Sequence, residues 1–179
     1  MVSKFKGIIL HWTAGTGKPN ADDMEHYHYL VGVYGDCYNG NFKPEDNLNC
    51  VDGKYAAQVG GGNTCRIGMA VCGMEGYLPS IGISSTHFPL TPKQCERFFK
   101  RVAEVAIQYD IDPNNGNIMT HKRFGEEDPT TTSYGKIDIS WLPPEIIGNF
   151  VGDLEDFILS KVRWYWYRIK EGVIKDGTE

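Results

Sequence analysis

Two apolar segments of the chain end on a histidine. IILHWTAG carries His11 directly after three aliphatic residues, and the apolar run of GNIMTHKRF ends at His121. A third segment, GKIDISWLP, carries Lys136 and Asp138 two positions apart, so both side chains point the same way in an extended chain. Two imidazoles and a carboxylate that leave one position for water are the ligands of a catalytic zinc site. The three segments are therefore candidates for such a site.

Histidine spacing alone does not select this pair. The chain has five histidines, and His26 and His28 form an equally suitable i, i+2 pair in the segment HYH. His87 lies in the proline-flanked loop STHFPLTP. A single histidine at the end of a strand is also more often a hydrogen-bonded core or rim residue than a metal ligand. The residues alone therefore leave a metal site and a purely structural role both open.

Local patterns predict the elements that must position these residues. Thr91 is a suitable N-cap and Pro92 a suitable first residue for a long helix in TPKQCERFFKRVAEVAIQYD. Asn20 is the expected N-cap of a short helix, and the chain after Pro144 is expected to be helical. The expected strands lie in KGIIL, YHYLVGVY, GKYAAQV, RIGMAVCGM and GNIMTHKRF. We therefore predict a single α/β domain with a central mixed β-sheet flanked by α-helices, with reactive groups at strand ends.

Composition excludes several classes of partner. The 179-residue chain can form one domain with a real core, since 41% of its residues are hydrophobic. Its 18 basic and 23 acidic side chains give a formal net charge of −5. Binding to nucleic acid or to an anionic membrane requires a concentrated basic face. We therefore expect neither as a partner, and we expect a monomer.

The chain shows no targeting or membrane-spanning signal. Its first apolar run covers only Ile8 to Leu10, whereas a signal peptide needs roughly 7–15 apolar residues. We therefore expect a cytoplasmic protein without stable membrane insertion. Five cysteines without CxxC spacing argue against a four-cysteine zinc site and for mostly reduced thiols. A disulfide between Cys37 and Cys50 is the alternative.

Six segments together resemble a known family. IILHWTAG, YHYLVG, RIGMAVCGM, PLTPKQ…FF, MTHKRFG and GKIDISWLP occur in the order found in zinc-dependent N-acetylmuramoyl-L-alanine amidases of the phage lysin and peptidoglycan-recognition-protein type. The resemblance runs from about Ile8 to Pro143. It implies the amidase type 2 fold, with residues 1–145 as the catalytic core and residues 146–179 as a C-terminal helical extension packed on or adjoining the core.

The resemblance implies roles for five residues. His11, His121 and Asp138 match the family's ligands to Zn²⁺. Tyr27 matches the catalytic tyrosine in the motif Y-[HN]-[FY]-L-[IV]-G, and Lys136 matches the catalytic lysine two positions before the last ligand. The implied reaction is hydrolysis of the amide bond between N-acetylmuramic acid and L-alanine in peptidoglycan or a muropeptide.

The resemblance also bears on the kind of amidase. Ala70 stands where relatives that recycle muropeptides carry a glutamate, which favours the subgroup that relies on tyrosine and lysine. Without a signal peptide, the expected enzyme is a phage-type endolysin that reaches the wall after release from the host cytoplasm. A cytosolic recycling amidase, hydrolysis of an L-Ala–D-Glu bond and a non-catalytic recognition module remain alternatives. No HExxH motif occurs, which disfavours a metalloprotease.

The sequence leaves the roles of two segments undecided. Residues 35–52 are polar and predict a long loop, which lengthens the hairpin after YHYLVG and is a candidate for lining the substrate groove. The C-terminal segment concentrates aromatic residues from Trp164 to Tyr167. Either a terminal helix packs this aromatic face on the domain, or the face contacts a wall or membrane surface.

Overall fold

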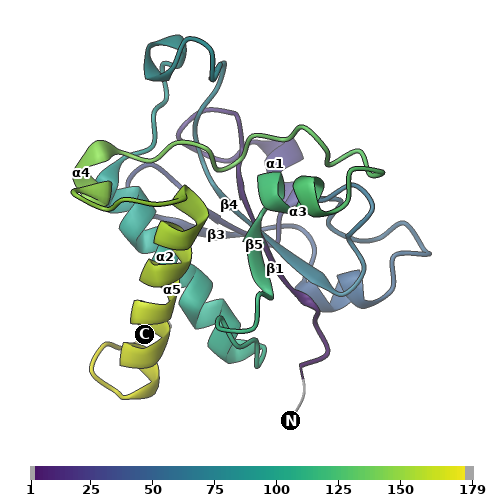
Figure 1. Cartoon of the computed structure of the whole chain (residues 1–179). Coiled ribbons are helices and arrows are strands. Elements are labelled where there is room, and N and C mark those ends of the chain that lie inside the picture. Colours follow the sequence, from purple (N-terminus) through teal and green to yellow (C-terminus); the bar gives the residue numbers. More distant parts are fainter. Residues whose placement is uncertain (1–2, 176–179) are drawn as a thin grey trace.

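The structure is a computed structural model, and it describes residues 3–175 of the chain. The ends of the predicted core and extension, residues 1–2 and 176–179, lie outside the described residues. A five-stranded sheet with the order β3-β2-β4-β1-β5 runs through the molecule (Figure 1). The strands are β1 (Gly7–Trp12), β2 (Tyr29–Val31), β3 (Cys37–Asn39), β4 (Arg66–Val71) and β5 (Ile118–Thr120). Only the edge strand β3 is antiparallel to its neighbour, so the predicted mixed sheet is confirmed.

Strand β1 lies between two parallel neighbours, and all six of its residues are buried. Burial on both faces explains its unbroken apolar run. Alternate side chains point to opposite faces. Ile8 and Leu10 join the large core, whereas Ile9 packs with Val59 and Phe124 on the other face. His11, two residues after Ile9, shares that second face.

Two long helices cover the large-core face of the sheet. Helix α2 (Pro92–Gln108) begins as predicted, with the Thr91 side chain accepting a hydrogen bond from the Gln94 amide. Helix α5 (Leu154–Lys170) packs beside α2 (Figure 1), and Phe157 meets Phe99 edge-on. The opposite face carries the short helices α1 (Ala21–His26), capped by Asn20 as predicted, and α3 (His121–Glu127).

The prediction of one continuous helix after Pro144 is wrong. A short helix α4 (Pro144–Ile147) ends at Gly148, whose φ of 56° lies in the left-handed region that glycine adopts most readily. The chain then crosses to Asp153, which caps α5. In α5 the aromatic cluster is divided. Trp166 packs against the core, whereas about half of the Trp164 surface is exposed.

The segment GKYAAQV forms no strand, contrary to prediction. Its backbone amides are bound by side chains instead of by a neighbouring strand. The Ala56 amide donates to Asn47 Oδ1, and the Gln58 and Val59 amides donate to Asn63 Oδ1, each at 2.9 Å. These asparagines therefore hold the segment as an ordered loop.

The polar stretch 35–52 is also more ordered than expected. It contains β3 and a short 3₁₀ helix, η1 (Pro44–Leu48). The cysteines are free thiols, so Cys37 and Cys50 form no bridge. Within residues 3–175, no helix is long and apolar enough to cross a lipid bilayer.

His28 links this stretch to the sheet. It is buried, its Nε2 donates to Asn47 Oδ1 at 2.9 Å, and its Nδ1 accepts from the Gly68 amide at 2.9 Å. Burial lowers the pKa of His28 from 6.5 to about 4, because a charged imidazole loses hydration there. His28 is therefore a neutral structural residue.

We expect His28 to make the fold sensitive to acid. Because its folded pKa is lowered, its contribution is complete above the unfolded pKa of about 6.5 and is lost as pH falls towards about 4. The loss amounts to about 3 kcal/mol at about 1.4 kcal/mol per pKa unit. The difference in unfolding free energy between the natural protein and His28→Gln, measured in urea, should shrink from pH 7 to pH 4. A constant difference would contradict this assignment.

Candidate metal centre

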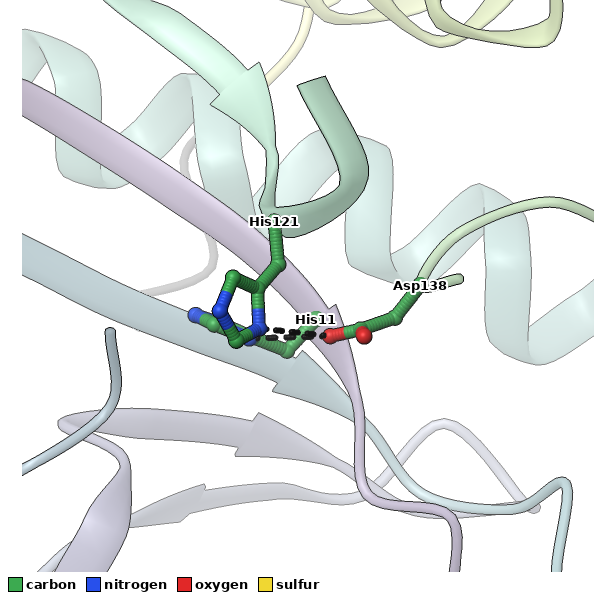
Figure 2. Close-up of side chains that lie close together, drawn as sticks. All are labelled: His11, His121 and Asp138. Atoms are coloured by element: carbon green, nitrogen blue, oxygen red, sulfur yellow. Dashed lines mark hydrogen bonds and ion pairs between the residues drawn. The ribbon is translucent and has the colours of Figure 1, made fainter. Parts of the chain in front are cut away.

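His11, His121 and Asp138 converge on one point although they are far apart in the sequence (Figure 2). One potential ligand atom from each lies within 4.8 Å of the others. Nδ1 of His11 is 3.0 Å from Asp138 Oδ2, and Nδ1 of His121 is 3.3 Å from the same oxygen. The three side chains are buried, with at most 8% of any residue exposed.

Parallel strand pairing places the two imidazoles together. Leu10 of β1 is in register with Thr120 of β5, and a histidine comes next in both segments: His11 within β1 and His121 as the first residue of α3. The two rings are therefore neighbours at the carboxyl ends of adjacent strands, with centroids 4.7 Å apart. Asp138 comes from the loop before α4, and its carbonyl accepts from the Lys122 amide at 2.8 Å. That bond ties the loop to the first turn of α3.

The charge states suit a cation site. Burial alone would raise the pKa of Asp138, but its contacts with His11 and His121 outweigh burial and hold the pKa well below its usual range. Burial lowers the pKa of His121, against an opposing hydrogen bond to Asp138. The cluster therefore contains an ionised carboxylate and, at His121, a neutral imidazole near neutral pH.

The hydrogen bonds around the two rings test whether a metal fits. Nε2 of His11 lies 2.7 Å from Gln58 Oε1. Nε2 of His121 lies 3.0 Å from Ser133 Oγ, which donates its own proton to the Gly60 carbonyl at 2.9 Å. Both nitrogens of each ring thus face an oxygen acceptor, and a neutral imidazole has only one N–H. A cation between the Nδ1 atoms and Oδ2 resolves the mismatch, so these residues fit a metal.

A cavity of about 740 Å³ opens onto this cluster. Its lining includes Trp12, Thr13, Ala14, His26, Tyr27, Gln58, Met74, Tyr77, His121, Lys136 and Asp138. The cavity provides room for an extended ligand beside the three converging side chains.

Tyr27 and Lys136, the other two residues implied by the resemblance, lie on the cavity wall. Tyr27 follows α1, and its ring centroid is 5.0 Å from that of His11. Burial raises the pKa of Tyr27 well above its ordinary value, so the phenol keeps its proton. Lys136 is exposed, and its charge is near enough to disfavour protonation of His121. The catalytic roles of both residues stay predictions.

The alternative histidines lie elsewhere or bind other groups. His26 is exposed at the cavity rim and contacts the Asp22 carbonyl, whereas His87 is exposed outside the cavity lining. Sequence reasoning missed Gln58 and Ser133. Gln58 lies in a segment with strand-like composition and Ser133 in a polar turn, so neither carries a local signal of its contact with a histidine.

A family comparison identifies the family of the chain. The family model for N-acetylmuramoyl-L-alanine amidases matches residues 2–133, and the chain therefore belongs to this family of peptidoglycan amidases. The resemblance noted from the ordered motifs is confirmed. No curated protein sequence matches the chain.

Several solved structures are similar to the chain at low sequence identity. The Staphylococcus aureus hydrolase AmiA, solved with its ligand, is 15% identical, with a TM-score of 0.53 over 96% of this chain and 77% of that chain. The E. coli amidase AmiD, solved with an anhydro-N-acetylmuramic acid peptide substrate, is 17% identical over 68% of this chain and 49% of that chain, with a TM-score of 0.43. The Ph2119 endolysin of a Thermus scotoductus bacteriophage is 17% identical over 68% and 73%, with a TM-score of 0.45.

Helix α5 contacts the strand end that leads into His121. Glu155 Oε2 accepts from the Thr120 amide at 2.8 Å and from Thr120 Oγ1 at 2.6 Å.

Glu155→Ala leaves the buried Thr120 amide without this acceptor, so we expect it to lower the free energy of unfolding by about 1–3 kcal/mol. Urea denaturation measures the loss. Asp156→Ala, one residue further along α5 and exposed, is the matched control, and equal stability of the two variants would contradict the expectation.

Proposed function

We propose that this amidase is zinc-dependent, with His11, His121 and Asp138 as the ligands and Tyr27 and Lys136 acting on the substrate. The observation that carries the proposal is the convergence of three buried ligand atoms within 4.8 Å of one another at the cavity. Imidazole nitrogen and carboxylate oxygen are established zinc donors, and three protein ligands leave one position for water. Two neutral imidazoles and one carboxylate leave the bound ion a net charge of about +1.

The substrate amide reacts within the cavity. Held by His11, His121 and Asp138, zinc would supply Lewis-acid activation of water near neutral pH. The Lys136 ammonium stabilises the negative charge that develops on the carbonyl oxygen of the N-acetylmuramoyl–L-alanine bond. Tyr27, kept protonated by burial, donates a hydrogen bond to the reacting group. Donors fixed before the reaction reduce the cost of reorganising charge in the transition state.

The residue beside His11 supports an enzyme of the tyrosine and lysine subgroup. Ala70 of β4 is in register with His11 and is fully buried, so its position offers no carboxylate to the cavity. Recycling relatives carry a glutamate at the matching position. We therefore propose polymeric peptidoglycan as the substrate, in an endolysin-type role that begins in the cytoplasm and ends at the wall. A recognition module is disfavoured because all three ligand types are present.

Replacing either histidine ligand should remove both metal and activity. His11→Ala and His121→Ala are expected to lower bound zinc below one equivalent and to abolish release of stem peptides from purified peptidoglycan. Atomic absorption measures the zinc, and mass spectrometry of the digest identifies the cleaved bond. His87→Ala, outside the cavity lining, should behave like the natural protein. Hydrolysis at the natural rate by either ligand variant would contradict the proposed mechanism.

Replacing Lys136 should separate metal binding from turnover. Lys136→Ala is expected to keep a full equivalent of zinc and to lose about 10²–10³ in kcat, the usual effect of removing one transition-state donor. Stopped digestion of peptidoglycan, with released peptides quantified over time, gives the rate. Lys43→Ala removes an exposed lysine outside the cavity lining and is the matched control. Equal rates for the two variants would make Lys136 an ordinary surface charge.

A further inference from the structure

Each candidate zinc-binding imidazole has an outward partner that the proposed reaction does not use. Gln58 is 6% exposed and presents Oε1 to His11 Nε2, and Ser133 is fully buried and presents Oγ to His121 Nε2. The amide oxygen only accepts hydrogen bonds. The single Ser133 hydroxyl proton is donated to the Gly60 carbonyl, so towards His121 this hydroxyl also acts as an acceptor.

These acceptors favour one of the two ring nitrogens as the carrier of the proton once a cation lies beside Asp138. A neutral imidazole has one N–H, and both of its nitrogens here face an oxygen. With a cation on the Asp138 side, the proton belongs on Nε2, where Gln58 and Ser133 accept it. The Nδ1 lone pair is then free, and the Nδ1 atoms are the ones 3.0 and 3.3 Å from Asp138 Oδ2. Both rings therefore direct their lone pairs to the same point as the carboxylate.

We propose that Gln58 and Ser133 are positioning residues of the zinc site, which hold His11 and His121 in the Nε2–H tautomer and orient both Nδ1 atoms towards one ion. This inference rests on the proposed zinc-dependent function. It names the residues that prepare the two histidines for zinc binding. Outer partners of this kind fix ring orientation and strengthen metal binding.

One loop segment holds both outward partners. Residues 56–63 carry Gln58, which reaches His11 directly, and Gly60, whose carbonyl fixes Ser133 and through it His121. Asn63 Oδ1 accepts from two amides of this segment, and Asn47 Nδ2 donates to the Asn63 carbonyl at 3.1 Å. The bonds that prevent this segment from forming a strand thus place an acceptor behind each imidazole.

The packing around Gln58 is specific to its position. A Cβ atom on Gly68 of β4 would lie 2.4 Å from Gln58 Cγ, so the glycine makes room for the glutamine stem against the sheet. Gln58 Nε2 is buried and has no hydrogen-bond partner among the described residues. An unpaired buried donor costs free energy. A glutamine at this position is explained if the oxygen of its side-chain amide is needed at His11.

Zinc affinity of the full chain, measured by competition with a chromogenic chelator, tests the proposal. Gln58→Leu and Ser133→Ala should each weaken zinc binding about 10–100-fold, the usual effect of losing an outer partner of a metal ligand. Gln58→Glu keeps an acceptor oxygen at the same reach and should retain the natural affinity. Lys54→Ala, exposed just before the segment, is the matched control.

A second measurement needs no variant. In the zinc-loaded natural protein, ¹⁵N NMR of the imidazoles should show the proton of both ligand rings on Nε2. A proton on Nδ1 of either ring, or folded Gln58→Leu and Ser133→Ala variants with the natural zinc affinity, would overturn the positioning roles and leave the zinc amidase intact. A natural protein that binds no zinc would overturn both proposals. A protein that shows the Nε2–H tautomers but releases no stem peptide would overturn the function alone.

Discussion

The parallel pairing of β1 with β5 sets Leu10 beside Thr120, and the next residue of each segment is a histidine. This register brings His11 and His121 within 4.7 Å between ring centroids. The arrangement depends on a central strand that is buried along its whole length, because a shift by one residue would turn every side chain to the opposite face. Helices α2 and α5 on one face and the 56–63 segment on the other hold that register.

The same region shows how polar groups are accommodated in a buried layer. Asp138 receives contacts from two imidazoles, and each imidazole meets a further acceptor behind it. Since buried polar groups are normally paired, a ring with acceptors on both sides needs either a second proton or a cation between it and the carboxylate. The chemistry of the cavity thus follows from hydrogen-bond geometry as well as from ligand type.

Elements with strong local signals could be predicted from the sequence. The apolar run of β1, the capped start of α2 at Thr91 and the mixed sheet are examples. The loop formed by residues 56–63 could not be predicted from the sequence, since its amides bind asparagine side chains and not a neighbouring strand. His11, His121 and Asp138 were selected by the order of family motifs, because spacing alone left other histidines equally eligible. Gln58 carries no such signal, since its partner His11 lies 47 residues away.

The long separation between the ligands has a consequence for how the protein assembles. Asp138 lies 127 residues beyond His11, so their contact forms only when β1, near the start of the chain, meets the loop before α4. Contacts between such distant parts of a chain form late and slowly, because loop closure is costly before the contacts are made. The proposed zinc ion would therefore bind only to the finished fold, and by mass action its supply would shift the balance between folded and unfolded chains. The supply of zinc would then change the fraction of newly made chains that is folded.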